Sequence, residues 1–558
     1  MKFKNLIILF ILTAVLFLSA CKDEPEPLFS TVTITENLGS TAQDVFFIFT
    51  NSSLTDYAPI VPSISGSARS VDVASPAISV FSKEVESRIF EEIRKFEELS
   101  YERRNQLARS ISPPSFAFTA VVDSYLETGT FYPGLSSTDG AIAATCQFVD
   151  TIDTKDTIDP IDDITLSIWV ADDCWTDGGT KSYLVDDTMV TAMVNQFLFA
   201  GVDNDIYDWV TSLYGVPWGI SADAYSGLVP GSEAGKITIF LHDIDNDNSS
   251  NGGTVGYFWS KDNYLSDQYS GSNERIMFYM DAVMYAKPDG TWDSTDPWPE
   301  IIYSTLGHEF QHMIQFYQKQ IIMGVNGTDT WVNEMCSEIT EDLVADKLVV
   351  PGPRGLGIDY SVGTQGITNS RLNEFNLYND ESLVEWGGFT SDYSSAYAFG
   401  AYLARNYGGA ALFRKIVQSS GTDEFAVINA VNTLNGINKT FEQLLIEWGE
   451  YVLTSENESV SGYNVYGEQF QSSADDPAGN TYTLGSINLE NYGNDVGWAL
   501  PLWGPKIYNG TVGNVMTDVP QAPASNIYYR AGYNLTGNQS WTVELPKGVT
   551  LTVLKKNS

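Results

Sequence analysis

One stretch, residues 301–344, constrains this chain of 558 residues more than any other. It contains two of only three histidines in the protein, His308 and His312, with Glu309 directly after the first. On a helix, residues four positions apart lie on one face, so the two imidazoles can bind one metal ion together. Glu309 lies about 100° round the same helix, where its carboxylate can reach a water molecule on that ion. The stretch therefore predicts a helix that holds a metal ion.

The two histidines need a further protein ligand, because a catalytic zinc ion usually has three, with one open position for water. A histidine six residues on is excluded, since Gln315 and Gln318 stand at the corresponding positions. The third histidine, His242, follows a strand-like run upstream and is more often a structural residue. Glu334 is the better candidate, because the chain before it is long enough to end one helix and begin a second. Glu338, one turn further, can accept a hydrogen bond from a ligand imidazole and fix its tautomer.

These motifs resemble those of the gluzincin zinc metallopeptidases, most of all the hyicolysin-type neutral metallopeptidases. The resemblance extends over roughly residues 140–450 and is sharp between 270 and 345. Four runs carry it, namely HEFQHM at 308–313, WVNE at 331–334 with Glu338, SNER at 272–275 and GYFW at 256–259.

The resemblance implies a fold, a cofactor and a reaction. The implied fold class is α+β, with a zincin-like catalytic domain. Zn²⁺ is implied on His308, His312 and Glu334, with Glu309 as general base and Glu338 behind the ligands. Bound zinc lowers the pKa of water toward about 7, so that it can attack a peptide carbonyl. The expected function is that of a zinc-dependent endopeptidase, a hydrolase that acts on extracellular proteins.

A stabiliser for the oxyanion is a further requirement of such a reaction. In several gluzincins a tyrosine on a downstream helix, just before a glycine, has this role. Tyr397 in the run YAFG at 397–400 is similar and is the first candidate, and Tyr393 is the second candidate. A packed aromatic residue is an equal alternative in a chain with 30 tyrosines.

A second class of function stays open beside the enzyme. The protein could be a cell-surface binding protein or adhesin with a non-catalytic, structural zinc site. The β-rich ends of the chain and its acidic composition suit this alternative. Glu309 favours the enzyme, because a structural zinc site has no use for it.

The first 20 residues predict export as a bacterial lipoprotein. Two lysines precede an apolar run at 6–18, which is typical of a secretory signal and too short for a comfortable membrane span. The run ends in LSAC, which resembles a lipobox with Cys21 as the lipidated residue; a simple signal with an incidental cysteine is the alternative. A lipid anchors without spanning. The expected location is the cell envelope, lipid-anchored in the outer membrane, with a weak sign of surface exposure in KDE at 22–24.

Composition restricts the partners. The chain is 43% hydrophobic and 13% aromatic, as expected for a folded protein, and its formal net charge is −41. Such a surface repels nucleic acid and anionic membrane, so neither is an expected partner. A protein or peptide substrate is the partner that the resemblance to the metallopeptidases implies. Asp243, Asp245 and Asp247 alternate like oxygen ligands of Ca²⁺. Their loop lacks the glycine and distal glutamate of an EF-hand, so a solvated acidic turn is the alternative.

The length of the chain predicts several domains. Residues 21–113 are expected to form an N-terminal β-rich module with an amphipathic helix, either a propeptide or an accessory domain. Residues 114–458 are expected to form the catalytic domain, and 459–558 a C-terminal β-rich domain. Cys146 and Cys174 lie in adjacent strand-like runs, where either a disulfide or two unpaired thiols is consistent with an exported protein.

Overall fold

The computed structural model describes ten ranges of the chain. The N-terminal signal, the candidate lipidation residue Cys21 and the predicted boundary at 113 lie outside the described residues. Within these ranges no helix is both long and apolar enough to cross a membrane. The described ranges are 28–59, 64–66, 88–109, 118–154, 163–356, 370–455, 470–473, 479–493, 503–509 and 520–557.

A mixed six-stranded sheet lies within residues 114–458, in the described part of the chain, with strand order β4-β5-β6-β7-β9-β8. Its central strands β6, β7 and β9 run parallel, and β8 closes one edge antiparallel to β9. The parallel strands are apolar on both faces, as expected where both faces are covered. The strands are β4 (Thr128–Phe131), β5 (Ile142–Asp153), β6 (Asp163–Ala171), β7 (Lys236–His242), β8 (Gly256–Tyr257) and β9 (Met277–Asp281).

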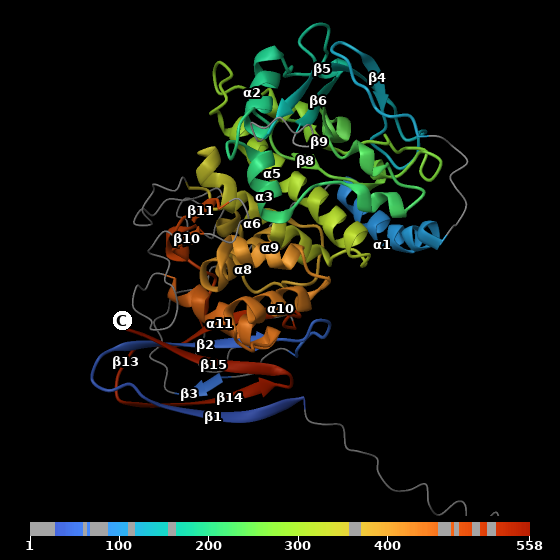
Figure 1. The fold of residues 1–558 in the computed structure, drawn as a ribbon. Coiled ribbons are helices and arrows are strands. Elements are labelled where there is room, and N and C mark those ends of the chain that lie inside the picture. Colours follow the sequence, from blue (N-terminus) through green and yellow to red (C-terminus); the bar gives the residue numbers. More distant parts are fainter. Residues whose placement is uncertain are drawn as a thin grey trace, which may run out of the picture.

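Helices lie between this sheet and a second β-region at the other end of the molecule (Figure 1). Three long helices form the centre, where α6 packs between α5 and α8. These are α5 (Pro297–Gln315), α6 (Thr330–Leu348) and α8 (Thr390–Tyr407). Around them lie α2 (Asp187–Phe197), α3 (Ile206–Tyr214), α4 (Ala282–Tyr285), α7 (Arg371–Tyr378), α9 (Gly409–Val417), α10 (Glu424–Asn435) and α11 (Phe441–Thr454), besides α1 (Arg88–Arg109). The predicted α+β class is confirmed.

The second β-region is a sandwich built from both ends of the chain. One sheet has the order β12-β13-β2-β15 and the other β1-β14-β3, so β2 lies between two C-terminal strands and β14 lies between two N-terminal strands. The β-rich segments within 21–113 and 459–558 therefore share sheets, instead of forming the two separate modules expected from the sequence. The strands are β1 (Phe29–Asn37), β2 (Gln43–Asn51), β3 (Ile64–Gly66), β12 (Tyr508–Asn509), β13 (Ser525–Leu535), β14 (Asn538–Pro546) and β15 (Val549–Asn557). A separate pair, β10 (Phe470–Ser473) and β11 (Thr481–Leu484), is antiparallel.

Strand β2 joins the sandwich to the helices, because both of its faces are buried. Phe47 points into the sandwich core, where its ring lies 5.6 Å from that of Trp541 on the opposite sheet. Its neighbours Phe46 and Ile48 belong to the main core, on the side of α11. Since side chains alternate between the faces of a strand, one strand supplies two cores.

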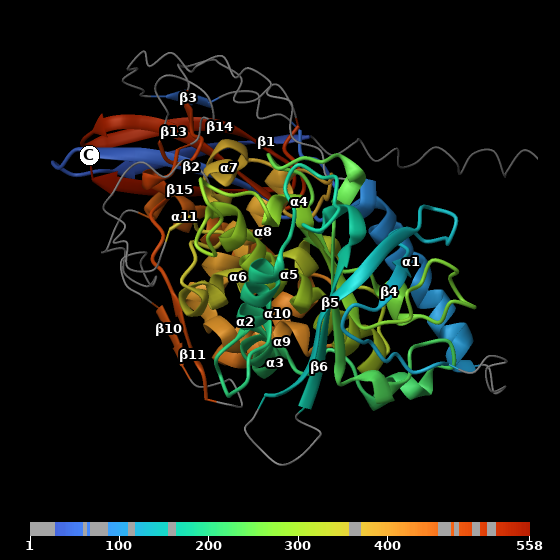
Figure 2. The ribbon, with the colours of Figure 1, turned by 90° about the horizontal axis from the view of Figure 1, so that it is seen from above.

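Helix α1 (Arg88–Arg109) matches the predicted amphipathic helix but packs on the part of the molecule that contains the six-stranded sheet. The Phe96 ring lies edge-on to Trp259 and Tyr264, with centroids 6.1 and 5.8 Å away. Glu97 accepts a hydrogen bond of 2.8 Å from Gln320, just beyond α5. Figure 2 shows α1 well separated from the sandwich strands. The N-terminal segment is therefore divided between the two parts of the molecule.

We predict that Phe47→Ala destabilises the sandwich by about 3–5 kcal/mol, because it removes a fully buried ring and leaves a cavity. Thr31→Ala, at an exposed position of β1, is the matched control and should change stability by less than about 0.5 kcal/mol. Chemical denaturation followed by tryptophan fluorescence checks both values. Equal effects of the two substitutions would contradict the shared sandwich core.

Candidate active site

Two consecutive helices position the site. Helix α5 begins with Pro297 at its first position, where the missing N–H costs nothing. The chain continues as a π-helical segment, Phe316–Ile322, and then turns at Gly324, whose φ of +64° favours glycine. Helix α6 starts at Thr330 and returns along α5. The predicted two-helix arrangement is thus present.

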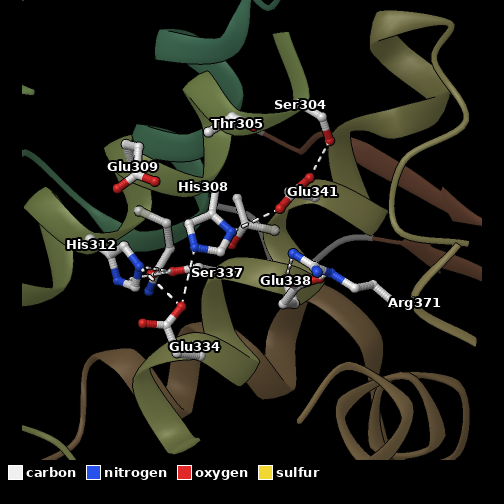
Figure 3. Close-up of polar contacts among 12 residues, drawn as sticks. Ser304, Thr305, His308, Glu309, His312, Glu334, Ser337, Glu338, Glu341 and Arg371 are labelled. Carbon is white, nitrogen blue, oxygen red and sulfur yellow. Dashed lines mark hydrogen bonds and ion pairs between the residues drawn. The ribbon is translucent and has the colours of Figure 1, made fainter. Parts of the chain in front are cut away.

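The three predicted metal ligands converge between these helices (Figure 3). The rings of His308 and His312 lie on one face of α5, with centroids 4.8 Å apart. Oε2 of Glu334, near the start of α6, lies 3.2 Å from Nε2 of His308 and 3.4 Å from Nε2 of His312. Ligand atoms on a tetrahedral zinc ion with bonds of about 2.05 Å are roughly 3.3 Å apart. The donor set and its spacing therefore fit zinc.

The charges in this cluster favour metal binding. Burial raises the pKa of Glu334, but the adjacent imidazoles outweigh burial and hold its pKa well below the usual range. Burial lowers the pKa of His308 and of His312, and here the hydrogen bonds and charges of neighbouring carboxylates outweigh it and raise both. Glu334 is therefore ionised, and a metal ion has to compete with protons for the two imidazoles.

Glu309 lies beside the ligands without being one of them. It is buried, and its Oε2 accepts a hydrogen bond of 2.8 Å from the backbone N–H of Phe258, which directly follows the edge strand β8. Burial raises the pKa of Glu309, although the nearby imidazoles oppose the shift. A carboxylate with a raised pKa, held by one oxygen, is suited to accept and return a proton.

Glu341, rather than the predicted Glu338, contacts the ligand imidazole. Its Oε1 lies 2.8 Å from Nδ1 of His308, and its Oε2 accepts from the Ser304 hydroxyl. Because a metal on Nε2 leaves the proton on Nδ1, His308 then donates to Glu341. Glu338 instead forms an ion pair of 2.8 Å with Arg371 of α7. Burial beside Glu341 raises the pKa of Glu338 to about 7, even though Arg371 opposes the shift.

The second imidazole has its own polar partners, which sequence reasoning missed along with Glu341. Nδ1 of His312 lies 3.1 Å from Oδ1 of Asn333 and 3.1 Å from the hydroxyl of Ser337. All these partners belong to α6, and Glu341 stands seven residues after Glu334, two turns along the same face. Helical spacing is thus a signal that could have found Glu341.

The structure does not bring Tyr397 to the ligands. Its side chain is fully buried, and the groups that act on its pKa are Asp342 and Arg405, with burial as the main cause of its upward shift. A fully buried hydroxyl cannot reach a substrate. Gly400, the glycine after it, has a packing role instead, because a Cβ there would lie 2.7 Å from Cγ1 of Ile339 on α6.

Tyr393, the reserve candidate, lies nearer to the polar groups around the site. It is half-buried, and its ring lies 5.2 Å from the guanidinium carbon of Arg371. It also contacts Trp386 edge-on, with ring centroids 4.8 Å apart. Arg371 in turn pairs with Glu338, so Tyr393 contacts the polar residues around the site and is the better placed of the two tyrosines.

The three aspartates considered for Ca²⁺ have different partners. Asp243 accepts from Nζ of Lys181 at 2.6 Å, and Asp247 accepts from a backbone N–H at 2.7 Å. Oδ2 of Asp245 lies 3.4 Å from the hydroxyl of Thr254. Among the described residues, the groups of three or more potential metal ligands lie only between α5 and α6. These contacts do not test calcium binding by the three aspartates, which stays a prediction.

The cysteines left open by the sequence are unpaired in the structure. Cys146 and Cys174 are both buried free thiols, and burial is the main cause of their raised pKa values. The Sγ of Cys146 lies 3.3 Å from a backbone carbonyl oxygen. Cys336 is buried as well, which agrees with a packing role.

A two-histidine, one-glutamate site on consecutive helices, with a second glutamate beside it, defines the class of the zinc metallopeptidases. A family model described as Peptidase M30 matches residues 149–556. The chain belongs to the peptidase M30 family.

Individual relatives were found as well. The chain is similar to the neutral metalloprotease ShpI of Staphylococcus hyicus, with 28% identity over 272 residues, which are 48% of this chain and 51% of the relative. The match thus spans about half the length of that relative. Among solved structures, the M1 zinc metallopeptidase of Deinococcus radiodurans has a TM-score of 0.28 and 11% identity, over 55% of this chain and 51% of the other.

Glu341→Gln should weaken zinc binding about 10–100-fold, because it replaces the carboxylate that orients His308. Glu338→Gln is the matched control on the same helix, and we expect a smaller loss since Glu338 pairs with Arg371. Competition with a chromophoric chelator measures both affinities. A larger loss of zinc affinity for Glu338→Gln than for Glu341→Gln would indicate that Glu338, the residue predicted from the sequence, contacts the imidazole.

Zinc affinity should rise with pH until the pKa values of both ligand histidines are exceeded. The neighbouring carboxylates raise these pKa values, and only the neutral imidazole binds metal, so zinc has to displace protons at lower pH. Calorimetric zinc titrations in two buffers of different ionisation enthalpy count the protons released. An affinity that does not change with pH would contradict this arrangement.

Proposed function

We propose that this protein is a zinc-dependent endopeptidase that hydrolyses peptide bonds of extracellular proteins. The observation that carries the proposal is the position of Glu309, buried beside the three ligands. Its carboxylate is not needed to hold zinc, and burying it raises its pKa at a cost in stability. Membership of a peptidase family and similarity to a neutral metalloprotease support the same reading.

Different residues of the site have different roles in the proposed reaction. His308, His312 and Glu334 would hold zinc, which lowers the pKa of water toward about 7 when bound. Glu309 takes a proton from the attacking water as general base and passes it to the leaving nitrogen of the substrate. The N–H of Phe258 holds Oε2 of Glu309, which leaves Oε1 for the proton.

A structural zinc site in a binding protein or adhesin is the alternative function. Structural zinc is almost always bound by four protein ligands. Within the described residues the cluster offers three, His308, His312 and Glu334. That donor set favours the enzyme.

For location, we propose that Cys21 is lipidated after removal of residues 1–20 and anchors the protein in the bacterial cell envelope, in the outer membrane. The lipobox-like LSAC run supports this. We expect Cys21→Ser to move the protein from the membrane fraction to the soluble fraction, with loss of the lipid mass by mass spectrometry. An unchanged distribution would favour a simple signal with an incidental cysteine.

Glu309→Gln should keep zinc but lower casein cleavage about 10²–10⁴-fold, because the amide cannot accept the proton of water. Glu300→Gln, which removes the same charge from the first turn of α5, is the control and should cleave normally. Zinc content by mass spectrometry and cleavage of fluorescent casein give the two readouts. Undiminished cleavage by zinc-loaded Glu309→Gln would exclude the mechanism.

A further inference from the structure

A cavity of about 540 Å³ lies at the carboxyl ends of β6 and β7, and His242 is among the residues that line it. It faces away from the candidate active site. Phe278 on β9 packs toward Phe310 of α5, so the next residue, Tyr279, points to the opposite face of the sheet. The His242 ring lies on that face, 5.8 Å from the ring of Tyr279.

His242 is the one histidine outside the candidate metal site, and its acceptor nitrogen has no hydrogen-bond donor among the described residues. Its side chain is 4% exposed, and neither ring nitrogen has a well-formed hydrogen bond, although the backbone of Asp243 lies close enough to act on the pKa of the ring. The imidazole ends a row of stacked rings, 5.0 Å from Phe240, which stacks on Phe131 at 4.4 Å. Burial lowers the pKa of His242 to about 4, so the ring is neutral near pH 7 and has one acceptor nitrogen. Buried polar atoms without partners are costly, and such an atom beside a cavity points to a ligand.

The wall of the cavity is acidic and already binds one ammonium group. Asp243 and Asn246 line it, and each has an oxygen 2.6 Å from Nζ of Lys181. Asp173, a third lining residue, lies 3.3 Å from the same Nζ. This internal contact shows which chemistry the wall accepts.

Two further lining aspartates face the cavity from other loops. Oδ2 of Asp139 accepts from the backbone N–H of Ser136, and Oδ1 of Asp172 accepts from the hydroxyl of Thr145. A carboxylate has two oxygens, so each aspartate keeps one that can accept a hydrogen bond from a ligand. Lys181 balances one of the four acidic side chains in the wall, which leaves the cavity negative.

We propose that this cavity binds a primary amine, either a free polyamine or the lysine side chain of a peptide. The acceptor nitrogen of His242 and the carboxylates of Asp139 and Asp172 accept hydrogen bonds from the ammonium group. The volume lies within the range of small-molecule sites, about 300–1,000 Å³. A metal ion fits less well, because no group of three donors in the described residues includes His242.

The three histidines of the chain make a direct test, since selective ¹³C labelling of histidine Cε1 yields three signals. In the zinc-loaded protein, we expect spermidine or the peptide acetyl-Gly-Lys-Gly-amide to shift the His242 signal saturably. The signals of His308 and His312 should stay in place, because they lie on the other side of the sheet. Response to spermidine alone identifies a free polyamine as the ligand, and response to the peptide identifies a lysine side chain.

Charge variants decide whether the aspartates form the site. Asp139→Asn and Asp172→Asn, both exposed at the rim, should each weaken binding about fivefold, as expected for one partly exposed charge. Asp267→Asn, at an exposed position on another turn, is the control and should leave binding unchanged. The proposal is overturned by an unmoved His242 signal at millimolar amine. It is also overturned if Asp139→Asn and Asp172→Asn both leave the affinity for the amine unchanged. A His242 signal that responds only to Ca²⁺ or added Zn²⁺ overturns it as well.

Discussion

The contact between the Glu334 carboxylate and the two imidazoles of α5 is the interaction on which the site depends. His308 and Glu334 are buried and the His312 side chain is only 12% exposed, so each group needs the others or a metal ion as a polar partner. Their spacing is set by the packing of α6 against α5, with α8 behind α6. Gly400 allows α8 to approach so closely, because any side chain there would meet α6.

Around the ligands lies a set of polar groups that come mostly from α6. Asn333 and Ser337 contact His312, and Glu341 contacts His308. Arg371 of α7 forms an ion pair with Glu338. Glu338 therefore binds a cation, whereas its neighbour Glu341 contacts a ligand imidazole. Such partners hold each imidazole in one tautomer and orientation, which makes it a better metal ligand because less conformational entropy is lost when the metal binds.

The local chemistry could be predicted from the sequence, and the long-range pairing could not. The spacing of His308 and His312 places both rings on one helical face, and Glu334 follows from counting ligands. The choice between Glu338 and Glu341 depends on the crossing of two helices and on Arg371, 30 residues beyond Glu341. Tyr397 fits the pattern of a tyrosine followed by a glycine, but the glycine, Gly400, is needed here for the close packing of α8 on α6. The terminal strands were recognisable by alternation, but alternation does not say that β2 pairs with β13 and β15.

The central claim is that this cluster holds zinc with an open position for chemistry. X-ray absorption at the zinc edge of the purified protein tests it most directly, because it counts and identifies the atoms around the ion. The account predicts two imidazole nitrogens, oxygen from one carboxylate, and a further oxygen that is replaced when a hydroxamate is added. A fourth protein ligand, with a spectrum that hydroxamate leaves unchanged, would contradict it.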